Sequence, residues 1–406
     1  MADTNWQWGR VVTYAGAFIA FLIGSGFATG QEVVQYFSAY GWQGAMGIAV
    51  VMLLFVYVGR EFVLIGKAQN VQNSGDMYTF LCGNVLGRFF DYFAIVFIYM
   101  SFIVMIGGTG ATVAQQYGMA PWIGAVCMGA VVAFTVICGL DKIVNVLGKV
   151  GPAIVLLTIA LGLWGILKQP QGLSNVEATL APLNLMKASS NWLFAALSYV
   201  GFCMLWLAGF MGLMGSSAKN LREVSYGAVL GAIGFSVALL IIALGLLANM
   251  EFIAGSMVPT LKFAASIHPL FATVFSVIVL AGIYTTAVPL LWQAAARFTN
   301  GKSTGFKALT VVLTILGVVV GLNVPFDKLV NVIYVINGYV GFVLLLFMVV
   351  PPSSANVRRK NKAAWSILKP KPQKIPSSTL GVFHGCHQYG LAQDDGAFAI
   401  DEHASL

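Results

Sequence analysis

Long apolar runs separated by short polar segments recur along this sequence up to residue 350. Ten of them are close to membrane length, at residues 11–37, 42–66, 90–117, 121–140, 143–168, 192–214, 223–249, 269–298, 307–324 and 327–350. A helix of about 20 apolar residues crosses a hydrocarbon core of roughly 30 Å. The pattern therefore predicts an all-α membrane protein with about ten transmembrane helices.

The composition favours the same class of protein. Of the 406 residues, 59% are hydrophobic and 9% are charged, whereas soluble domains carry about 25% charged residues. The net charge of +8 is compatible with nucleic-acid binding, but the basic residues lie between the apolar runs and after residue 350 instead of forming one patch. We therefore expect the lipid bilayer, and not nucleic acid, as a partner.

The distribution of lysine and arginine predicts the orientation of the chain. If the N-terminus is cytoplasmic, 18 of the 22 basic residues fall on the inside, and four fall outside, namely Lys168, Lys187, Lys262 and Lys328. Basic residues are enriched in cytoplasmic loops. We expect a multi-pass protein of the bacterial inner membrane with both termini in the cytoplasm.

The chain divides at residue 350 into a predicted transmembrane domain (1–350) and a predicted cytoplasmic, disordered tail (351–406). Beyond Pro370 the tail is polar and has no apolar period. Its HGCH segment, His384 to His387, offers two ligand types in four residues and no second cluster, so we predict no metal site there. The sequence also lacks a nucleotide-binding loop and a catalytic triad, so we expect neither an enzyme nor a cofactor.

A polar stretch interrupts the first apolar run at FLIGSGFATGQEVV, residues 21–34. Gly24 and Gly26 lie in its middle, and glycine costs about 1 kcal/mol in a helix interior. A broken helix is tolerated in a membrane only where it is buried in protein or lines a watery cavity. Close packing against another helix is an alternative explanation of the glycines. It does not explain the neighbouring polar residues Ser25, Thr29, Gln31 and Glu32.

The sixth run carries a similar stretch, Ser198-Tyr199-Val200-Gly201-Phe202. The first and sixth runs each open a set of five, and an odd number inverts the second set in the membrane. Interrupted helices at matching places in two halves indicate a transporter with a midplane substrate site. Such breaks free amides for a carboxylate and carbonyls for a cation. We predict a five-plus-five inverted repeat with helices 1 and 6 interrupted, which binds a small-molecule substrate.

Two motifs resemble those of a known superfamily. Ile-Gly-Ser-Gly-Phe at residues 23–27 resembles the first-helix GSG motif of the amino acid–polyamine–organocation (APC) superfamily, whose carriers share the leucine-transporter-type fold. Residues 280–286 (LAGIYTT) resemble the stretch of helix 8 that supplies hydroxyl ligands to sodium in that fold. Over about residues 8–350 the chain looks most like the YkvI-like bacterial membrane proteins of this superfamily.

The resemblance implies roles for individual residues. It implies a substrate site that frames the carboxylate and amine of an amino acid, formed by Gly24, Ser25, Gly26, Phe27, Ser198, Tyr199, Gly201 and Phe202. It implies a cation site, for Na⁺ if sodium is the coupling ion, formed by the Ala20 and Ile23 carbonyls and the Thr285 and Thr286 hydroxyls. A shift of one residue in helix 8 brings in Tyr284. Span three offers Tyr99 and Ser101 for the wall of the substrate site.

Two ionisable residues lie in the predicted spans, and charge within a membrane is a functional hypothesis by default. Glu32 lies beyond Gly26 toward the outside, close enough to the interface to be hydrated. It is either a gate residue or proton carrier, or a vestibule acid with a polar partner.

Lys149 lies in the fifth predicted span, with Asn145 four residues earlier. It is either a lysine that snorkels to the interface or an ammonium in the place of sodium, as the resemblance to proton-coupled carriers implies.

The sequence as a whole predicts a secondary active transporter of an amino acid or related small zwitterion or amine. Alternating access would be coupled to H⁺ or Na⁺, and we favour H⁺ because a lysine in the cation site makes sodium redundant. The alternatives are a non-transporting receptor or assembly protein that keeps the fold, and a channel. The sequence does not specify the substrate, the direction of transport or the oligomeric state.

Overall fold

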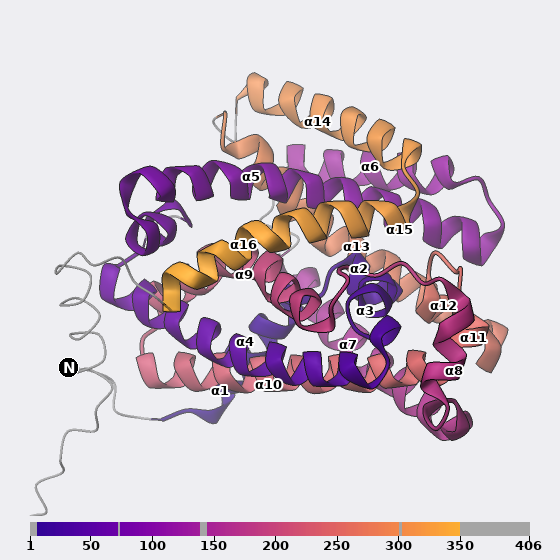
Figure 1. The fold of residues 1–406 in the computed structure, drawn as a ribbon. Coiled ribbons are helices and arrows are strands. Elements are labelled where there is room, and N and C mark those ends of the chain that lie inside the picture. The colour runs from indigo at the N-terminus through magenta and orange to yellow at the C-terminus, as the bar shows by residue number, and fades with distance from the viewer. Residues whose placement is uncertain (1–5, 72–73, 139–143, 300–302, 350–406) are drawn as a thin grey trace, which may run out of the picture. The chain divides into compact units, whose positions relative to one another are not determined.

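The computed structural model describes residues 6–71, 74–138, 144–299 and 303–349, and residues 74 and 144–152 are described by their backbone only. Regular structure within these ranges is helical (Figure 1). The tail predicted at 351–406, with its HGCH segment, lies outside the described residues.

The helices follow the apolar runs of the sequence. The first run forms three helices, α1 (Trp8–Leu22), α2 (Ser25–Thr29) and α3 (Gln31–Tyr36). The later long helices are α4 (Trp42–Gln69), α5 (Ser74–Tyr117), α6 (Pro121–Cys138), α7 (Val144–Lys168), α9 (Trp192–Ser217), α10 (Leu221–Ala248), α13 (Pro269–Ala296), α14 (Thr304–Asn323) and α16 (Val335–Val349). The shorter segments are η1 (Ser38–Tyr40), η3 (Pro170–Leu173), α8 (Val176–Leu180), η4 (Ala181–Leu183), α11 (Met250–Ile253), α12 (Pro259–Ile267), α15 (Phe326–Leu329) and η5 (Val330–Tyr334).

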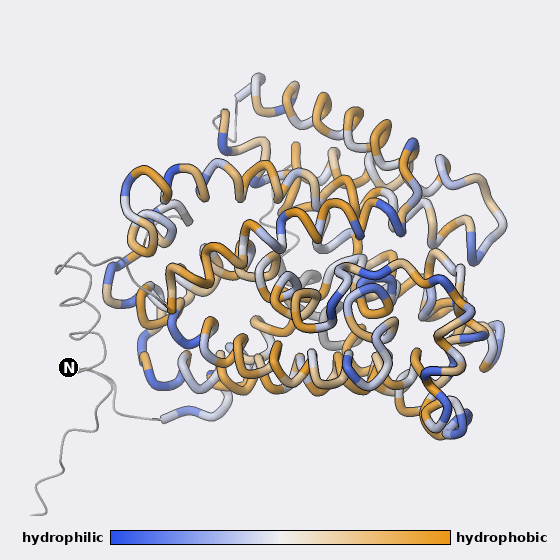
Figure 2. Tube along the Cα trace, viewed as in Figure 1, coloured by the Kyte–Doolittle hydropathy of each residue, from blue (hydrophilic) through white to orange (hydrophobic). Residues whose placement is uncertain are grey.

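Eight helices in the described part of the chain are long and apolar enough to cross a membrane. Two shorter apolar helices, Trp8–Leu22 and Ala153–Lys168, lie in the first and fifth predicted spans. Figure 2 shows apolar residues along the long helices and hydrophilic residues mainly where these helices are joined. The prediction of an all-α membrane protein is confirmed, and the number of ten spans stays a prediction.

The long helices pack in two groups. The first group contains α1, α4, α9 and α10, with α16 packed against α9. Within it, α4 and α10 lie side by side (Figure 1). The second group contains α5, α6, α13 and α14. Helix α7 contacts both α10 and α13, and therefore connects the two groups.

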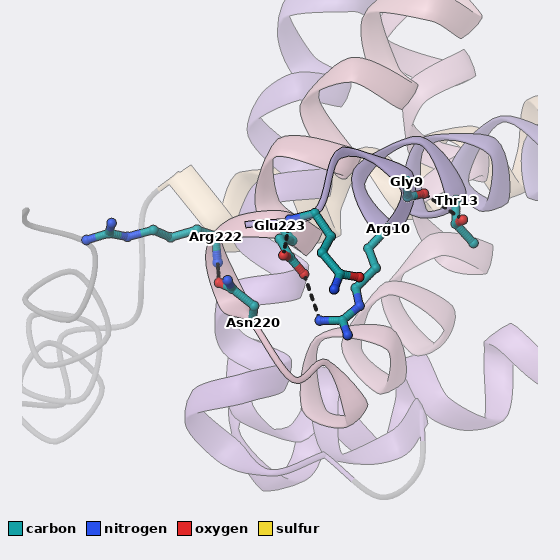
Figure 3. A network of polar contacts seen from close by, with 7 residues as sticks. Gly9, Arg10, Thr13, Asn220, Arg222 and Glu223 are labelled. Carbon is teal, nitrogen blue, oxygen red and sulfur yellow. Dashed lines mark hydrogen bonds and ion pairs between the residues drawn. The ribbon is translucent and has the colours of Figure 1, made fainter. Parts of the chain in front are cut away.

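An ion pair lies within each group. In the first group, Glu223 of α10 is fully buried; its Oε1 accepts a hydrogen bond from the Gln7 amide at 2.8 Å, and its Oε2 lies 3.6 Å from Nη1 of Arg10 in α1 (Figure 3). In the second group, Arg297 at the end of α13 pairs with Asp91 of α5. Each of these two pairs therefore joins helices of the same group.

The predicted interruption of the sixth span is wrong. Helix α9 runs without a break from Trp192 to Ser217, so the carbonyls of Ser198 and Tyr199 belong to a continuous helix. The small residues in its middle serve packing against α16. A Cβ on Gly341 would lie 2.8 Å from the Gly201 Cα and would overlap the Gly201 carbonyl. Glycine at both positions allows the two helices to approach closely.

Candidate functional site

The break predicted in the first span is present. Helix α1 ends at Leu22, Ile23 and Gly24 have extended backbone (ψ 103° and −171°), and α2 begins at Ser25. Amides in the first turn of a helix have no intrahelical carbonyl partner. The Ser25 amide reaches the Met105 sulfur, a weak acceptor, at 3.4 Å. All residues of α2 are buried, so the break lies within protein, as the membrane requires.

A second change of direction brings Glu32 back to the break. Gly30 has a φ of +78°, in the left-handed region that favours glycine, and it separates α2 from α3. A Cβ on Gly26 would lie 3.0 Å from Cδ of Glu32 and would overlap its Oε2. The expectation that Glu32 is hydrated near the interface is wrong, because the residue is only 3% exposed and its carboxyl lies beside the first turn of α2.

Aromatic rings from α3, α9 and η5 form a connected cluster that reaches this carboxyl through Tyr199. Oε1 of Glu32 accepts a hydrogen bond from the Tyr199 hydroxyl at 3.1 Å. The ring centroids of Tyr36 and Tyr199 are 5.4 Å apart, and those of Phe202 and Tyr334 are stacked at 4.7 Å. We call the following residues the Glu32 cage: Glu32, Tyr36, Tyr199, Phe202, Trp206 and Tyr334.

Several buried polar atoms in and beside the Glu32 cage lack a hydrogen-bond partner among the described residues. They are the hydroxyls of Tyr36, Tyr334 and Ser25 and Nε1 of Trp206. A buried polar group without a partner costs about 1–3 kcal/mol, and native proteins contain few of them. These side chains lie near one another, with the Tyr36 hydroxyl facing Ser198 and the Tyr334 hydroxyl facing Ser25, so the cage offers a group of buried hydroxyls to a polar ligand or water.

The carbonyl groups at the C-terminal end of α1 lie next to helix α13. Oγ1 of Thr286 donates to the Ile23 carbonyl at 3.2 Å and to the Gly282 carbonyl at 3.1 Å. Oγ1 of Thr285 donates to the same Gly282 carbonyl at 2.8 Å. The Ala20 carbonyl accepts from the Ile23 amide at 3.4 Å. Of the predicted cation-site residues, the structure therefore joins Thr286 and Ile23 directly.

The contacts of α13, which is helix 8 of the sequence analysis, do not support the shift of one residue that would bring Tyr284 into the cation site. The Tyr284 hydroxyl lies 2.8 Å from Oγ1 of Thr135 in α6, so it is engaged within the second group of helices. Thr286, two residues later, is the hydroxyl that contacts the break.

Other predicted site residues are not brought to the Glu32 cage. The Tyr99 hydroxyl donates to the Leu313 carbonyl of α14 at 2.9 Å, and Ser101 donates to the carbonyl of Phe97 one turn earlier in its own helix. The side chains of Lys149 and Asn145 lie outside the described residues, and only their backbone is placed, in α7. Their roles stay predictions.

A cleft of about 690 Å³ lies between α5, α12 and the loop that precedes α15, and its lining includes Gln115, Lys262 and Phe326. Next to its lining, Gly108 lies close to the break, because a Cβ on Gly108 would be 3.1 Å from the Ser25 Cβ. The short helix α12 lies in the connection between α10 and α13. Oγ1 of Thr260 in α12 donates to the Ala28 carbonyl at 2.8 Å, so this helix covers α2.

Three members of the cage were not predicted from the sequence, namely Tyr36, Trp206 and Tyr334. For two of them, the sequence contains a pattern from which their place in the site could have been predicted. Tyr36 lies four residues after Glu32, on the same face of a helix. Tyr334 lies between two asparagines, Asn331 and Asn337, that interrupt the tenth run after its charged start at Asp327 and Lys328. Trp206 had no comparable signal, because its neighbours in the sixth run are apolar.

A broken first helix, a buried carboxyl beside it and two groups of helices define a membrane protein of the leucine-transporter-type fold. Solved structures of transporters confirm this fold. MhsT in complex with L-phenylalanine is 14% identical, has a TM-score of 0.60 and is matched over 88% of this chain and 93% of that chain. A mutant of the Eremococcus coleocola manganese transporter is 11% identical, with a TM-score of 0.56 and coverage of 90% and 93%. Inward-facing Mhp1 is 15% identical, with a TM-score of 0.56 and coverage of 82% and 73%.

Two relatives come from Bacillus subtilis (strain 168). The uncharacterized membrane protein YkvI is 22% identical over 349 residues, which are 83% of this chain and 94% of YkvI. The uncharacterized protein YyaD is 23% identical over 374 residues, 85% of this chain and 98% of YyaD. They confirm the resemblance to YkvI-like membrane proteins. No protein-family model matches the sequence. None of these relatives or structures is named as an enzyme.

Proposed function

We propose that this protein is a secondary active transporter of an amino acid or related small zwitterion or amine, driven by H⁺ or Na⁺. The observation that carries the proposal is the buried break at Ile23 and Gly24, with the Glu32 carboxyl held against it. Broken helices at the middle of a membrane form the substrate sites of many secondary transporters. The leucine-transporter-type fold supports the same function, and so does the L-phenylalanine that MhsT binds.

Alternating access in this proposal is a rotation of the two helix groups relative to each other. The first group carries α1 and α9 of the site, and the second carries Thr286 and Met105, which contact the break. The ion pairs Arg10–Glu223 and Asp91–Arg297 each join helices of one group, which suits two units that move as rigid bodies. The ten spans, the five-plus-five repeat and the cytoplasmic termini are parts of this proposal.

Counterflow in proteoliposomes tests the proposed function. Purified protein is reconstituted, loaded with one unlabelled amino acid or amine at a time, and exposed to a trace of the same compound in labelled form. A transporter accumulates the label transiently and saturably for at least one compound. Binding without flux would favour a receptor or assembly protein, and a sustained current without saturation would favour a channel.

Proton coupling is the expected outcome of a gradient experiment. Uptake is expected to follow an inward pH gradient without sodium, and Lys149→Ala is expected to lose that dependence, because the proposal gives the lysine ammonium the place of a sodium ion. The matched variant Thr286→Val, which removes the hydroxyl on the Ile23 carbonyl, is expected to change uptake by less than about threefold. Strict sodium dependence that is lost in Thr286→Val and kept in Lys149→Ala would assign the coupling to Na⁺.

A further inference from the structure

A carboxyl of the chain itself lies beside the place where a substrate carboxylate is expected. In the predicted site, the amides around Ser25, Gly26 and Phe27 hold the carboxylate of an amino acid. In the structure, the Glu32 carboxyl folds back onto this first turn of α2, because a Cβ on Gly26 would overlap its Oε2. A substrate carboxylate there would be close to the Glu32 carboxyl, and two carboxylates in a buried site repel each other with little screening.

Glu32 also lacks a positive partner among the residues whose side chains are described. The carboxylates of Glu223 and Asp91 have arginine partners, whereas the polar contact of Glu32 is the neutral Tyr199 hydroxyl. A buried carboxylate is costly unless a cation or several hydrogen bonds compensate it. A cation bound beside it would therefore hold Glu32 in its ionised form, whereas without one the carboxyl keeps its proton.

The walls of the cage suit a cation. Neighbouring rings lie with centroids 5.0 Å apart for Tyr199 and Phe202 and 5.8 Å apart for Trp206 and Tyr334. The faces of tyrosine, tryptophan and phenylalanine attract ammonium groups, by about 2 kcal/mol when the cation is desolvated. These rings pack edge to face against one another, and a carboxyl among them gives the charge and the aromatic surface that a small organic cation requires.

The polar atoms without partners specify the kind of cation. The Tyr36, Tyr334 and Ser25 hydroxyls are buried and make no hydrogen bond of full geometry within the described part of the chain, and hydroxyl oxygens accept hydrogen bonds. A primary ammonium has three N–H donors, enough for the Glu32 carboxylate and two of these hydroxyls. A quaternary ammonium has none and would leave the hydroxyls unpaired.

We propose that the Glu32 cage binds a small primary amine without a carboxylate, with Glu32 as its counter-ion. This substrate class rests on the proposed transport function, and it narrows that function from amino acids and zwitterions to amines. The ammonium lies between Glu32 and the hydroxyls of Tyr36 and Tyr334, and the apolar part of the amine lies against Phe202 and Trp206.

The experiment compares amines with the amino acids from which they differ by one carboxylate. Full-length protein in lipid nanodiscs is titrated calorimetrically with phenethylamine and phenylalanine, and with isoamylamine and leucine. At least one amine is expected to bind about tenfold or more tightly than its amino acid. Glu32→Gln keeps the shape of the side chain and is expected to lower the affinity for the amine by about tenfold or more.

Two further variants separate charge recognition from folding. Glu251→Gln removes an exposed carboxylate of α11 and is expected to leave the affinity unchanged. Tyr334→Phe keeps the ring, removes one unpaired hydroxyl, and is expected to weaken binding of the primary amine about three- to tenfold. If Glu32→Gln does not fold, the Tyr334→Phe variant still tests whether the amine binds in the Glu32 cage.

The outcomes distinguish the substrate class from the transport function. Tighter binding of the amino acid than of its amine, or equal binding of the amine by wild type and Glu32→Gln, would overturn the amine assignment and leave the proposed transporter intact. Failure of all four compounds to bind would also overturn it. Binding of an amine without counterflow of that amine would instead contradict the transporter and keep the assignment.

Discussion

A Gly26→Leu variant is expected to reach the membrane and to have lost substrate affinity by about a hundredfold. Even the first side-chain atom at this position would overlap Oε2 of Glu32. The leucine must therefore expel the carboxyl from the first turn of α2 and break its hydrogen bond with Tyr199. The proposed amine then loses its contact with Glu32, and loss of a hydrogen bond to a charged group costs about 1.5–3 kcal/mol, which is about ten- to a hundredfold in affinity. Binding and counterflow with purified protein measure the effect.

Gly16→Leu is the matched control for this variant. Gly16 lies in α1, and a Cβ there would meet no heavy atom within 4 Å outside its own helix. The control is expected to keep the affinity and the melting temperature of the wild type. If Gly26→Leu kept wild-type affinity as well, the glycine would serve packing alone, and the break would not be a substrate site.

A Gly341→Leu variant is expected to lower the free energy of unfolding by about 3 kcal/mol or more. The clash is with the backbone of α9, because a Cβ on Gly341 would overlap the carbonyl of Gly201. A backbone within a continuous helix cannot turn aside as a side chain can, so the two helices must separate. Size-exclusion profiles and thermal unfolding of the purified protein are expected to show aggregation or a markedly lower melting temperature.

Gly305→Leu provides the comparison for the packing prediction. A Cβ at Gly305 would have its nearest neighbour at 3.8 Å, an ordinary van der Waals distance. This variant is expected to unfold at nearly the wild-type temperature. A Gly341→Leu protein as stable as Gly305→Leu would show that α16 is not held closely against α9.

The break in the first span could be predicted because several residue types there agree. Gly24 and Gly26 disfavour a helix, and the polar residues around them need partners that lipid does not supply. The sixth span offered a glycine and a serine in an apolar setting, and the same residue types also favour close packing of helices. Only the position of Gly201 opposite Gly341 decides between the two explanations, and the sequence does not contain that pairing.

The position of Glu32 could not be predicted from its distance along the chain. A straight helix beyond Gly26 would have carried it toward the interface. Gly30 adopts a left-handed conformation instead, and this single residue reverses the direction in which Glu32 points. Glycine allows that conformation without requiring it, so the sequence permits a hydrated acid and a buried one equally. The cage around Glu32 depends on contacts between α3, α9 and η5, which are distant in the sequence.

The two ion pairs have a consequence for how the protein should respond to its ionic environment. Arg10–Glu223 and Asp91–Arg297 each stay within one group of helices, so neither has to break in the rotation proposed for alternating access. Added electrolyte weakens ion pairs that are partly exposed to solvent. The arginine side chains of both pairs are partly exposed. High ionic strength should therefore lower the resistance of each group to heat while leaving the turnover rate of the intact carrier nearly constant.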